Sequence, residues 1–365
     1  MSSTNIHKAL TDLNRGAFLN PVEVPDNPWF AMVGADLSAM CRQSLDEPVE
    51  FTFNQLFVPQ ACAMYKYRVV VMSAQMFNML CLVAECVVAK RAFPHVGNVP
   101  EGSWTPDPEN SFRVIRQDLG RRTFSWSEAS TSEWVRNPTR MNLFFYVLLV
   151  LARFVVLHEL GHIWHEHGAR NESLNSFEVD EMGGPTGALT QDKALASQAR
   201  ELVADDFALN SLLEIQEHEL TLKADTDFVK TLVPQLLKTR QQRYDFLLQM
   251  IHLYFTVMDR PDWEQFDLSA MSHPPAPMRL FALHLQAANS GFIKTTKRSA
   301  SKRTAAFILA ADALPCFLFN RYPSLWQTRG DVSSFSRRFE EIYPALRAWQ
   351  RRLGLPPVSR IHPMT

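Results

Sequence analysis

Two histidines and a glutamate occur in the chain at the spacing H-E-x-x-H, as His158, Glu159 and His162. If this stretch is helical, the two histidines lie four residues apart on one face, so both imidazoles can bind the same metal ion. Glu159 then lies beside the metal, where its carboxylate can accept a proton from a bound water molecule. The pattern predicts the chemistry of a zinc hydrolase with one Zn²⁺ per chain, and it requires a third ligand.

The segment that carries the motif is predicted to be a long buried helix. Asn137 is a typical N-cap residue, Pro138 suits the first helical position, and Gly168 provides a stop signal. The sequence before the motif is apolar on almost every side, which is typical of a helix that runs through the middle of a domain. Two histidines and a glutamate buried at the end of such a helix would be costly unless paired, and a metal ion would offset that cost.

The residues around the motif exclude two known classes of zinc peptidase site and include one histidine that is an alternative ligand. The metzincin extension requires a glycine and a histidine three and six residues after His162, but those positions hold His165 and Gly168. The reversed order H-x-x-E-H is absent as well. His165 lies seven residues after His158, nearly on the same helix face, and is therefore an alternative ligand.

A glutamate on a second helix is the expected third ligand. Glu201 and Asp205 fall within a segment predicted to be helical from about residue 190 to 219. Because they are four residues apart they share a face, so Glu201 can bind the metal while Asp205 orients a ligand histidine. The alternative for this pattern is an ordinary solvated charge pair at a helix surface.

Three motifs occur in a fixed order: HELGH, then RELVADDFA, then Ser272 to Pro275 followed by Arg279. This set resembles that of the metallopeptidases that include HtpX and the CAAX prenyl-protein endopeptidases. The likeness covers the chain from about Val155 to Ala282 and does not extend to the first 130 residues. The chain also resembles the Lit-type phage-exclusion peptidases, which are soluble bacterial enzymes with a similar set of zinc ligands.

The resemblance to the HtpX and CAAX endopeptidase family implies roles for four residues. Glu201 would be the third zinc ligand, and Asp205, with Arg279, would support the site from outside the ligand set. His273 would lie near the oxyanion of the substrate, on a rigid Pro-Pro turn from which it projects into a cleft. A surface turn residue is the alternative for His273.

The expected fold class is α+β and mostly α-helical, a zincin-like metallopeptidase core with a small β-sheet and two ligand-bearing helices. Residues 49–53 and 65–71 show alternation and β-branched or aromatic side chains, which predict strands. Residues 74–90 have the composition of a buried helix. Residues 1–46 predict a short helix followed by an extended stretch marked by prolines.

Three sections are expected along the chain. Residues 1–130 would be an N-terminal α/β part of the catalytic unit, 131–290 the catalytic core and 291–365 a C-terminal helical section. The acidic stretch 169–188 predicts a loop between the two ligand helices, most simply a solvated connection. The basic run 294–303 predicts a solvated linker, because no aromatic residues interleave it as in nucleic-acid sites.

Composition narrows the setting and the partners. A net charge of −1 gives no support for a nucleic-acid or anionic-membrane partner. The five cysteines are scattered without a C-x-x-C, which is typical of reduced thiols, and residues 1–20 lack an apolar signal segment. The apolar stretches 69–89 and 143–157 contain polar or charged residues, so neither predicts a convincing membrane span. We therefore expect a cytoplasmic protein that acts on a protein or peptide substrate.

The expected activity is that of a zinc metalloendopeptidase. Zinc held by His158, His162 and Glu201 would lower the pKa of a water molecule to about 7, and Glu159 would accept its proton. His273 would donate a hydrogen bond to the developing oxyanion. Two alternatives stay open at this point: an intracellular effector or phage-exclusion peptidase restricted to one substrate, and a catalytically silent regulatory protein in which zinc is only a structural staple.

Overall fold

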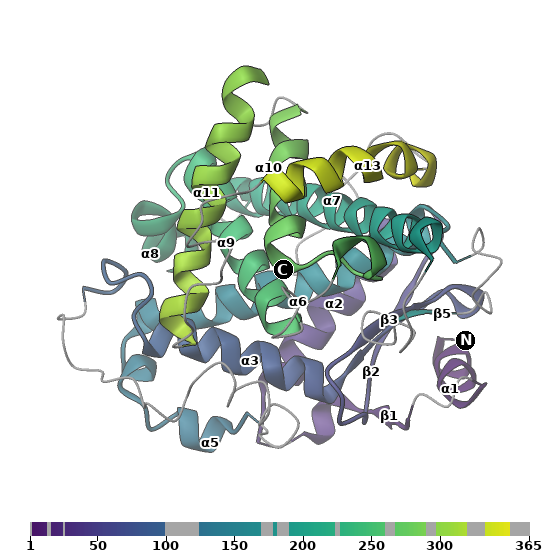
Figure 1. The fold of residues 1–365 in the computed structure, drawn as a ribbon. Coiled ribbons are helices and arrows are strands. Elements are labelled where there is room, and N and C mark those ends of the chain that lie inside the picture. The colour runs from purple at the N-terminus through teal and green to yellow at the C-terminus, as the bar shows by residue number, and fades with distance from the viewer. Residues whose placement is uncertain are drawn as a thin grey trace.

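The fold is known from a computed structural model, which describes residues 2–12, 16–24, 26–98, 124–168, 178–180, 190–222, 227–259, 267–289, 297–319 and 333–350. Helices form most of the described chain and a small sheet lies at one side, which confirms the predicted α+β, mostly helical class (Figure 1). In chain order the helices and strands are α1 (Ser2–Asp12), β1 (Phe18–Leu19), η1 (Pro21–Glu23), α2 (Trp29–Ser44), β2 (Glu50–Asn54), β3 (Ala61–Met64), η2 (Tyr65–Tyr67), β4 (Val69–Ser73), α3 (Ala74–Ala89), α5 (Trp126–Ala129), η3 (Glu133–Arg136), α6 (Pro138–Trp164), β5 (Glu178–Asp180), α7 (Gln191–Leu222), α8 (Asp227–Leu236), α9 (Arg240–Met258), η5 (Leu268–Ala270), α10 (Ala276–Asn289), α11 (Lys297–Leu318) and α13 (Ser333–Trp349).

The sheet is mixed, with strand order β1-β2-β4-β3-β5. Strands β2 and β4 run parallel, with Phe51 opposite Val70, and the other neighbouring pairs are antiparallel. The short turn η2 joins β3 to β4 and is closed by Arg68, whose backbone lies in the left-handed region at φ 52°. This turn allows β3 and β4 to pair side by side.

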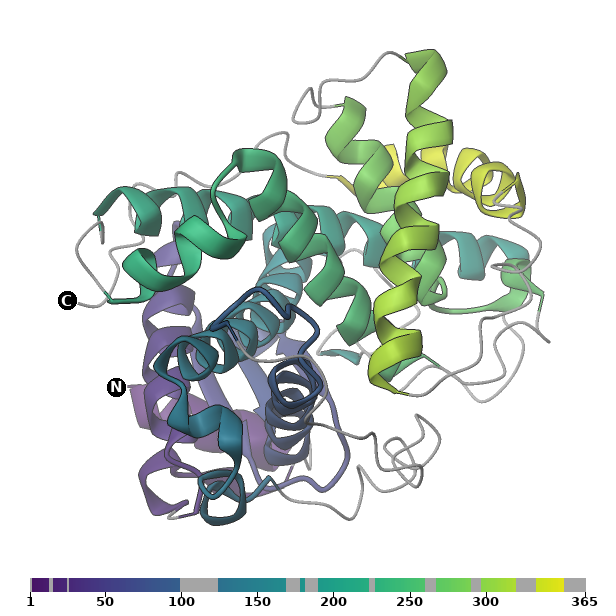
Figure 2. The same ribbon diagram turned by 90° about the vertical axis from the view of Figure 1, so that its left-hand side faces the viewer.

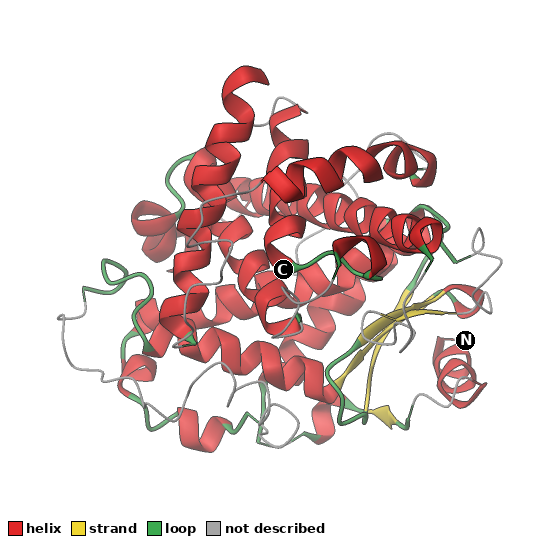
Figure 3. Ribbon diagram, in the orientation of Figure 1, coloured by secondary structure: helices red, strands yellow, loops and turns green. Residues whose placement is uncertain are grey.

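Strand β4 is apolar from Val69 to Met72 because the sheet is covered on both faces. Val69 and Val71 pack with Leu10 of α1, whereas Val70 and Met72 belong to the main core. Successive side chains of a strand point to opposite faces, so a strand covered on both sides needs a continuous apolar run rather than an alternating one. Figure 3 shows the strands lying between α1 and the rest of the helices.

Helix α6 runs through the interior and packs against α2, α3, α7, α8, α9 and strand β3. Its N-terminus is capped by Asn137, whose side chain accepts hydrogen bonds from the backbone N–H groups of Thr139 and Arg140. The predicted start of the helix is therefore confirmed. The helix ends at Trp164, four residues before the predicted stop at Gly168.

The length and composition of α6 would also allow it to cross a membrane, and no other helix in the described ranges meets both criteria. A central helix of a folded domain has the same properties. In this protein, 89% of the most apolar window of α6 is buried against other elements of the chain.

Apolar side chains from Trp29 in α2 to Leu346 in α13 form one continuous core cluster. Residues from all three sections of the chain contribute to it. The C-terminal helices α10, α11 and α13 lie together at one side of the molecule (Figure 2).

Four predicted segments differ from the structure. Residues 65–71 do not form one strand, because the left-handed turn at Arg68 separates η2 from β4, and strand β3 before them lacks a clear alternation. The predicted extended approach in 1–46 contains α2, because a proline just before a helix does not disrupt it. The basic run 294–303 leads into α11 from Lys297, since Lys, Arg and Ala all favour helix. Within the predicted loop 169–188, residues 178–180 form edge strand β5, and the other residues lie outside the described ranges.

A largely buried ion cluster joins α6 to α2 and α7. The guanidinium of Arg153 donates to the two carboxylate oxygens of Asp36 at 2.7 and 2.8 Å and to Glu219 Oε1 at 2.8 Å. Burial lowers the pKa of Arg153, but the two carboxylates outweigh burial and raise it above its ordinary value. Because Glu219 belongs to α7, this cluster fixes one of the predicted ligand-bearing helices against the other.

We predict that Arg153→Met lowers the free energy of unfolding by about 3–5 kcal/mol, because Asp36 and Glu219, with side chains only 19% and 12% exposed, would lose their shared cation. Urea unfolding of the purified variant measures the change. Arg240→Met is the control, since Arg240 and Glu217 form a pair at 3.7 Å with side chains 61% and 43% exposed, and such pairs contribute about 0–1 kcal/mol. Equal losses in the two variants would contradict this role of Arg153.

Candidate metal centre

The last two turns of α6 place His158, Glu159 and His162 in the interior, with no exposed surface on any of them. The two histidines share a helix face, and their Nε2 atoms lie 3.1 Å apart. Their rings are nearly perpendicular, at 80°. Both Nε2 atoms therefore converge on the same region from one helix.

Helix α7 reaches this region because a glycine lies where α6 and α7 meet. A Cβ atom added to Gly161 would lie 3.1 Å from the Cα atom of Ala204 and 3.2 Å from its carbonyl oxygen. Those atoms are backbone and cannot rotate away, so a side chain at position 161 would separate the helices. The close approach brings Glu201, three residues before Ala204, within reach of both histidines.

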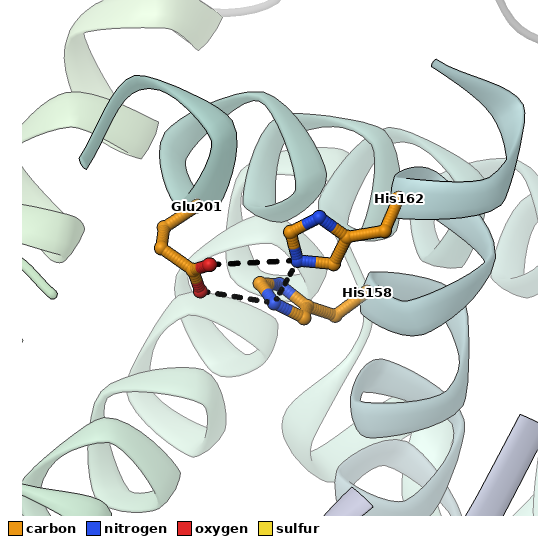
Figure 4. Close-up of side chains that lie close together, drawn as sticks. All are labelled: His158, His162 and Glu201. Carbon is orange, nitrogen blue, oxygen red and sulfur yellow. Dashed lines mark hydrogen bonds and ion pairs between the residues drawn. The ribbon is translucent and has the colours of Figure 1, made fainter. Parts of the chain in front are cut away.

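Glu201 completes the group from the second helix. Its Oε2 atom lies 3.3 Å from His158 Nε2, and its Oε1 atom lies 3.6 Å from His162 Nε2. Figure 4 shows the three side chains converging from two helices. Burial raises the pKa of Glu201, but the imidazoles of His273, His158 and His162 outweigh burial and hold it well below its ordinary value. The carboxylate is therefore ionised, the state in which it can bind a cation.

The geometry of His158, His162 and Glu201 fits a bound metal ion. In a tetrahedral site with bonds of about 2.0–2.1 Å, neighbouring ligand atoms are about 3.3 Å apart. The observed separations of 3.1, 3.3 and 3.6 Å bracket that value. Burial lowers the pKa of His162 to about 3, so its imidazole is neutral, as metal binding requires. This buried group could hold a metal ion, and the described part of the chain contains no second group with such geometry.

Asp205 and Arg279 hold the first histidine from behind. Asp205 Oδ1 lies 2.9 Å from His158 Nδ1, and Arg279 of α10 donates to the two carboxylate oxygens of Asp205 at 2.7 and 2.8 Å. The guanidinium of Arg279 also lies 3.9 Å from the ring centroid of Phe255. Asp205 is completely buried, so it is not a surface charge. We call His158, His162 and Glu201 the donor group. Asp205 and Arg279 lie outside it and contact it through His158.

The neighbouring carboxylates of Asp205 and Glu201 also favour the protonated form of His158. Burial lowers the pKa of His158, but the hydrogen bonds and negative charges of Asp205 and Glu201 outweigh burial and raise it well above its ordinary value. Burial likewise raises the pKa of Asp205, whereas Arg279 and His158 lower it below its ordinary value. With Nδ1 bound to Asp205, a metal ion at Nε2 would displace the second proton of the ring.

His273 lies beside the group, on the turn between η5 and α10. Its Nε2 atom is 3.8 Å from Glu201 Oε2, and its side chain is 25% exposed whereas that of Glu201 is 3% exposed. The hydroxyl of Ser272 lies 2.9 Å from the other ring nitrogen. His273 therefore reaches the donor group from a partly open side, too far from Glu201 for a hydrogen bond.

The two histidines after the motif take different places. His165, the alternative ligand, is buried but does not belong to the group with metal-ligand geometry. His167 was given no role from the sequence, yet its Nδ1 atom lies 2.8 Å from His162 Nδ1. A continued helix would carry His167 away from His162. The helix instead ends at Trp164, and Glu166 in the left-handed region (φ 56°) turns the chain back.

Tyr65 is a second residue near the site that the sequence did not indicate. Its ring lies against Gly168, where an added Cβ would come within 2.3 Å of the ring. Burial raises the pKa of Tyr65 well above its ordinary value, and the negative charge of Glu159 raises it further. Tyr65 follows strand β3, far from the motif in sequence, so no local pattern connects the two.

We predict that Asp205→Asn weakens metal affinity by about 10- to 100-fold and also destabilises the fold, because Arg279 loses its buried carboxylate. The double variant Asp205→Asn with Arg279→Met should recover stability but not metal affinity. Thermal unfolding of the metal-free protein and competition with a chromophoric chelator measure the two properties. Asp206→Asn, on the same helix, is the matched control and should change affinity less than about threefold. Wild-type affinity in the double variant would show that Asp205 does not act on the metal ligands.

No family model matches the chain, and neither the curated proteins nor the solved structures compared with it show significant similarity.

Proposed function

We propose that the protein is a zinc-dependent metallopeptidase that hydrolyses peptide bonds of protein substrates. The observation that carries the proposal is the buried group of His158, His162 and Glu201, with Glu159 on the same turn of α6. Two imidazoles and one carboxylate are the protein ligands of many catalytic zinc sites. The ordered motifs that resemble those of the HtpX and CAAX endopeptidase family also support it.

Glu159 is the proposed general base. When bound, the zinc ion would supply an electrophile for the scissile carbonyl and increase the acidity of a water molecule. As the water oxygen bonds to the carbonyl carbon, Glu159 accepts a water proton and then passes it to the leaving amine as the C–N bond breaks. A carboxylate one residue after a ligand histidine lies close enough for this transfer without being a ligand itself.

His273 is the proposed hydrogen-bond donor to the developing oxyanion. Its partly exposed position beside the donor group is where a substrate carbonyl can approach from solvent. Pro274 and Pro275 restrict the backbone next to it, and Ser272 contacts its Nδ1 atom. A donor fixed in advance stabilises charge that appears only in the transition state.

The main alternative is a structural zinc ion that stabilises the fold and takes no part in catalysis. Structural zinc sites usually have four protein ligands, whereas the group in the described residues supplies three. A structural site also has no use for a buried carboxylate such as Glu159 next to the ligands. These two features favour catalysis.

We also propose that the protein acts in the reducing environment of the cytoplasm and that its macromolecular partner is its protein or peptide substrate. None of the five cysteines forms a disulfide. Reduced thiols are the usual state in the cytosol, which supports the setting. A restricted substrate range, as in an effector that cleaves one protein, would involve the same residues.

We predict about one zinc per chain in the wild-type protein, with zinc lost in Glu201→Ala and retained in Glu159→Gln. Glu201 is assigned as a ligand, whereas Glu159 is assigned as a base, so only the first substitution removes a donor atom. Elemental analysis measures the metal, and mass spectrometry of new N-termini in a digested proteome measures cleavage. Both variants should lack cleavage, and Glu214→Gln, an exposed carboxylate on α7, should behave as wild type. Cleavage by Glu159→Gln at the wild-type rate would rule out the assigned base.

For His273→Ala we predict unchanged zinc content, nearly unchanged KM and a kcat lower by about 100- to 1000-fold. The reason is that an oxyanion donor acts only when charge develops in the chemical step. Zinc content and steady-state kinetics are measured on one preparation, with a peptide substrate found in the proteome digest. Loss of zinc would make His273 a ligand, and an unchanged kcat would make it an ordinary turn residue.

A further inference from the structure

The two ligand histidines differ in what holds their second ring nitrogen. His158 Nδ1 contacts the carboxylate of Asp205, whereas His162 Nδ1 contacts another imidazole, that of His167, at 2.8 Å. His167 has no exposed surface. The orientation of His162 therefore depends on a buried imidazole and not on a carboxylate.

Counting protons fixes the role of each ring. Two nitrogens at 2.8 Å share one proton, so one ring donates and the other accepts. A metal ion on His162 Nε2 requires that nitrogen to be unprotonated, which leaves Nδ1–H as the donor of the neutral ring. His167 Nδ1 is then the acceptor. The opposite arrangement would put a proton on His162 Nε2 and block the metal.

The backbone brings His167 to this position through the turn that ends α6. The N–H of His167 donates to the carbonyl of His162 at 3.1 Å, and the N–H of Glu166 donates to the carbonyl of Ile163 at 3.1 Å. Glu166 adopts the left-handed conformation that usually favours glycine at this point of a helix C-terminus. The turn thus folds His167 back onto the ring of His162.

The rings of Trp349 and His165 pack against the ring of His167. The ring of Trp349, at the end of α13, meets it edge to face with centroids 5.7 Å apart, and His165 stacks on it at 5.6 Å. The guanidinium of Arg200 lies 4.9 Å from the Trp349 ring centroid, and Arg200 directly precedes the ligand Glu201. Helix α13 packs along α7 (Figure 1), and Trp349 contacts both Arg200, which precedes Glu201, and His167, which contacts His162.

We propose that His167 is a positioning residue of the metal centre: it accepts the Nδ1 proton of His162, thereby fixing the metal-binding tautomer, and Trp349 of α13 holds it in place. This inference rests on the proposed metal binding. It gives a role to a histidine that is not a ligand, and it connects the C-terminal helix to the site.

The test compares variants that keep or remove the acceptor. His167→Phe keeps an aromatic ring but has no acceptor, and His167→Gln moves the acceptor away. Both should weaken Zn²⁺ binding by about 10- to 100-fold. In His167→Asn the side-chain oxygen occupies nearly the position of Nδ1, so binding should stay within about threefold of wild type. Competition with a chromophoric chelator gives the Kd for Zn²⁺, and the absorption spectrum of the Co²⁺-loaded protein reports ligand geometry.

Two further variants separate hydrogen bonding from packing. His165→Phe retains a stacking ring without touching the hydrogen bond between His162 and His167, and it should bind Zn²⁺ like wild type. Trp349→Ala should weaken binding by at least about threefold, and Trp349→Phe should restore it. Thermal unfolding of each metal-free variant identifies those that lose the fold. If His167→Phe does not fold, the Zn²⁺ affinities of His167→Gln and His167→Asn still compare a side chain without the acceptor in place with one that has it.

The outcomes distinguish this inference from the proposed function. If the wild-type protein binds no Zn²⁺, both are overturned. If the wild type binds Zn²⁺ and folded His167→Phe or His167→Gln binds it equally with the same Co²⁺ spectrum, only the role of His167 is overturned. Equal weakening in His167→Asn and His167→Gln would also overturn it, because the acceptor position would not matter. An unchanged affinity in Trp349→Ala would overturn the role of α13.

Discussion

The close contact between α6 and α7 at Gly161 sets the geometry on which the rest of the site depends. Three donor atoms must lie about 3.3 Å apart to share a tetrahedral ion, and one of them comes from a different helix than the other two. Two helices with ordinary side chains at their contact pack with axes about 8–10 Å apart. A glycine against the backbone of Ala204 allows the closer approach that a short carboxylate such as Glu201 needs. The central position of α6 then keeps this approach fixed.

Placing the site in the interior creates an electrostatic cost that the fold offsets locally. Asp205 of α7 is matched by Arg279 of α10, and Asp36 of α2 and Glu219 of α7 are matched by Arg153 of α6. Each guanidinium bridges elements distant in sequence, so these buried ion pairs also determine how α2, α6, α7 and α10 fit together. Buried charges are costly unless they are paired with good geometry, and here the pairing serves the alignment of the ligand helices.

The sequence predicted those parts of the site that depend on local spacing. His158 and His162 share a face because four residues make about one helical turn, and the same rule relates Glu201 to Asp205. The helical class and the start of α6 followed from composition and capping in the same way. The residues that were missed depend on a turn or on long-range packing. His167 reaches His162 only because the helix stops early and Glu166 takes a left-handed conformation, which an uninterrupted 3.6-residue period cannot indicate. Tyr65 lies near the site because strand β3, which it follows, packs against α6, and α2 was obscured by prolines that precede it.

Helix α10 connects the partly open side of the site to its buried side. Asp259 caps this helix by accepting from the N–H of Ala276 at 2.6 Å, directly after the turn that carries His273. One turn further along, Arg279 binds Asp205 behind His158. A shift of α10 would therefore move His273 relative to Glu201 and Asp205 relative to His158 at the same time. Because His158, His162 and Glu201 lie on two long helices and His273 lies on a short restrained turn, the arrangement combines a rigid group of possible metal ligands with a neighbour that solvent can reach.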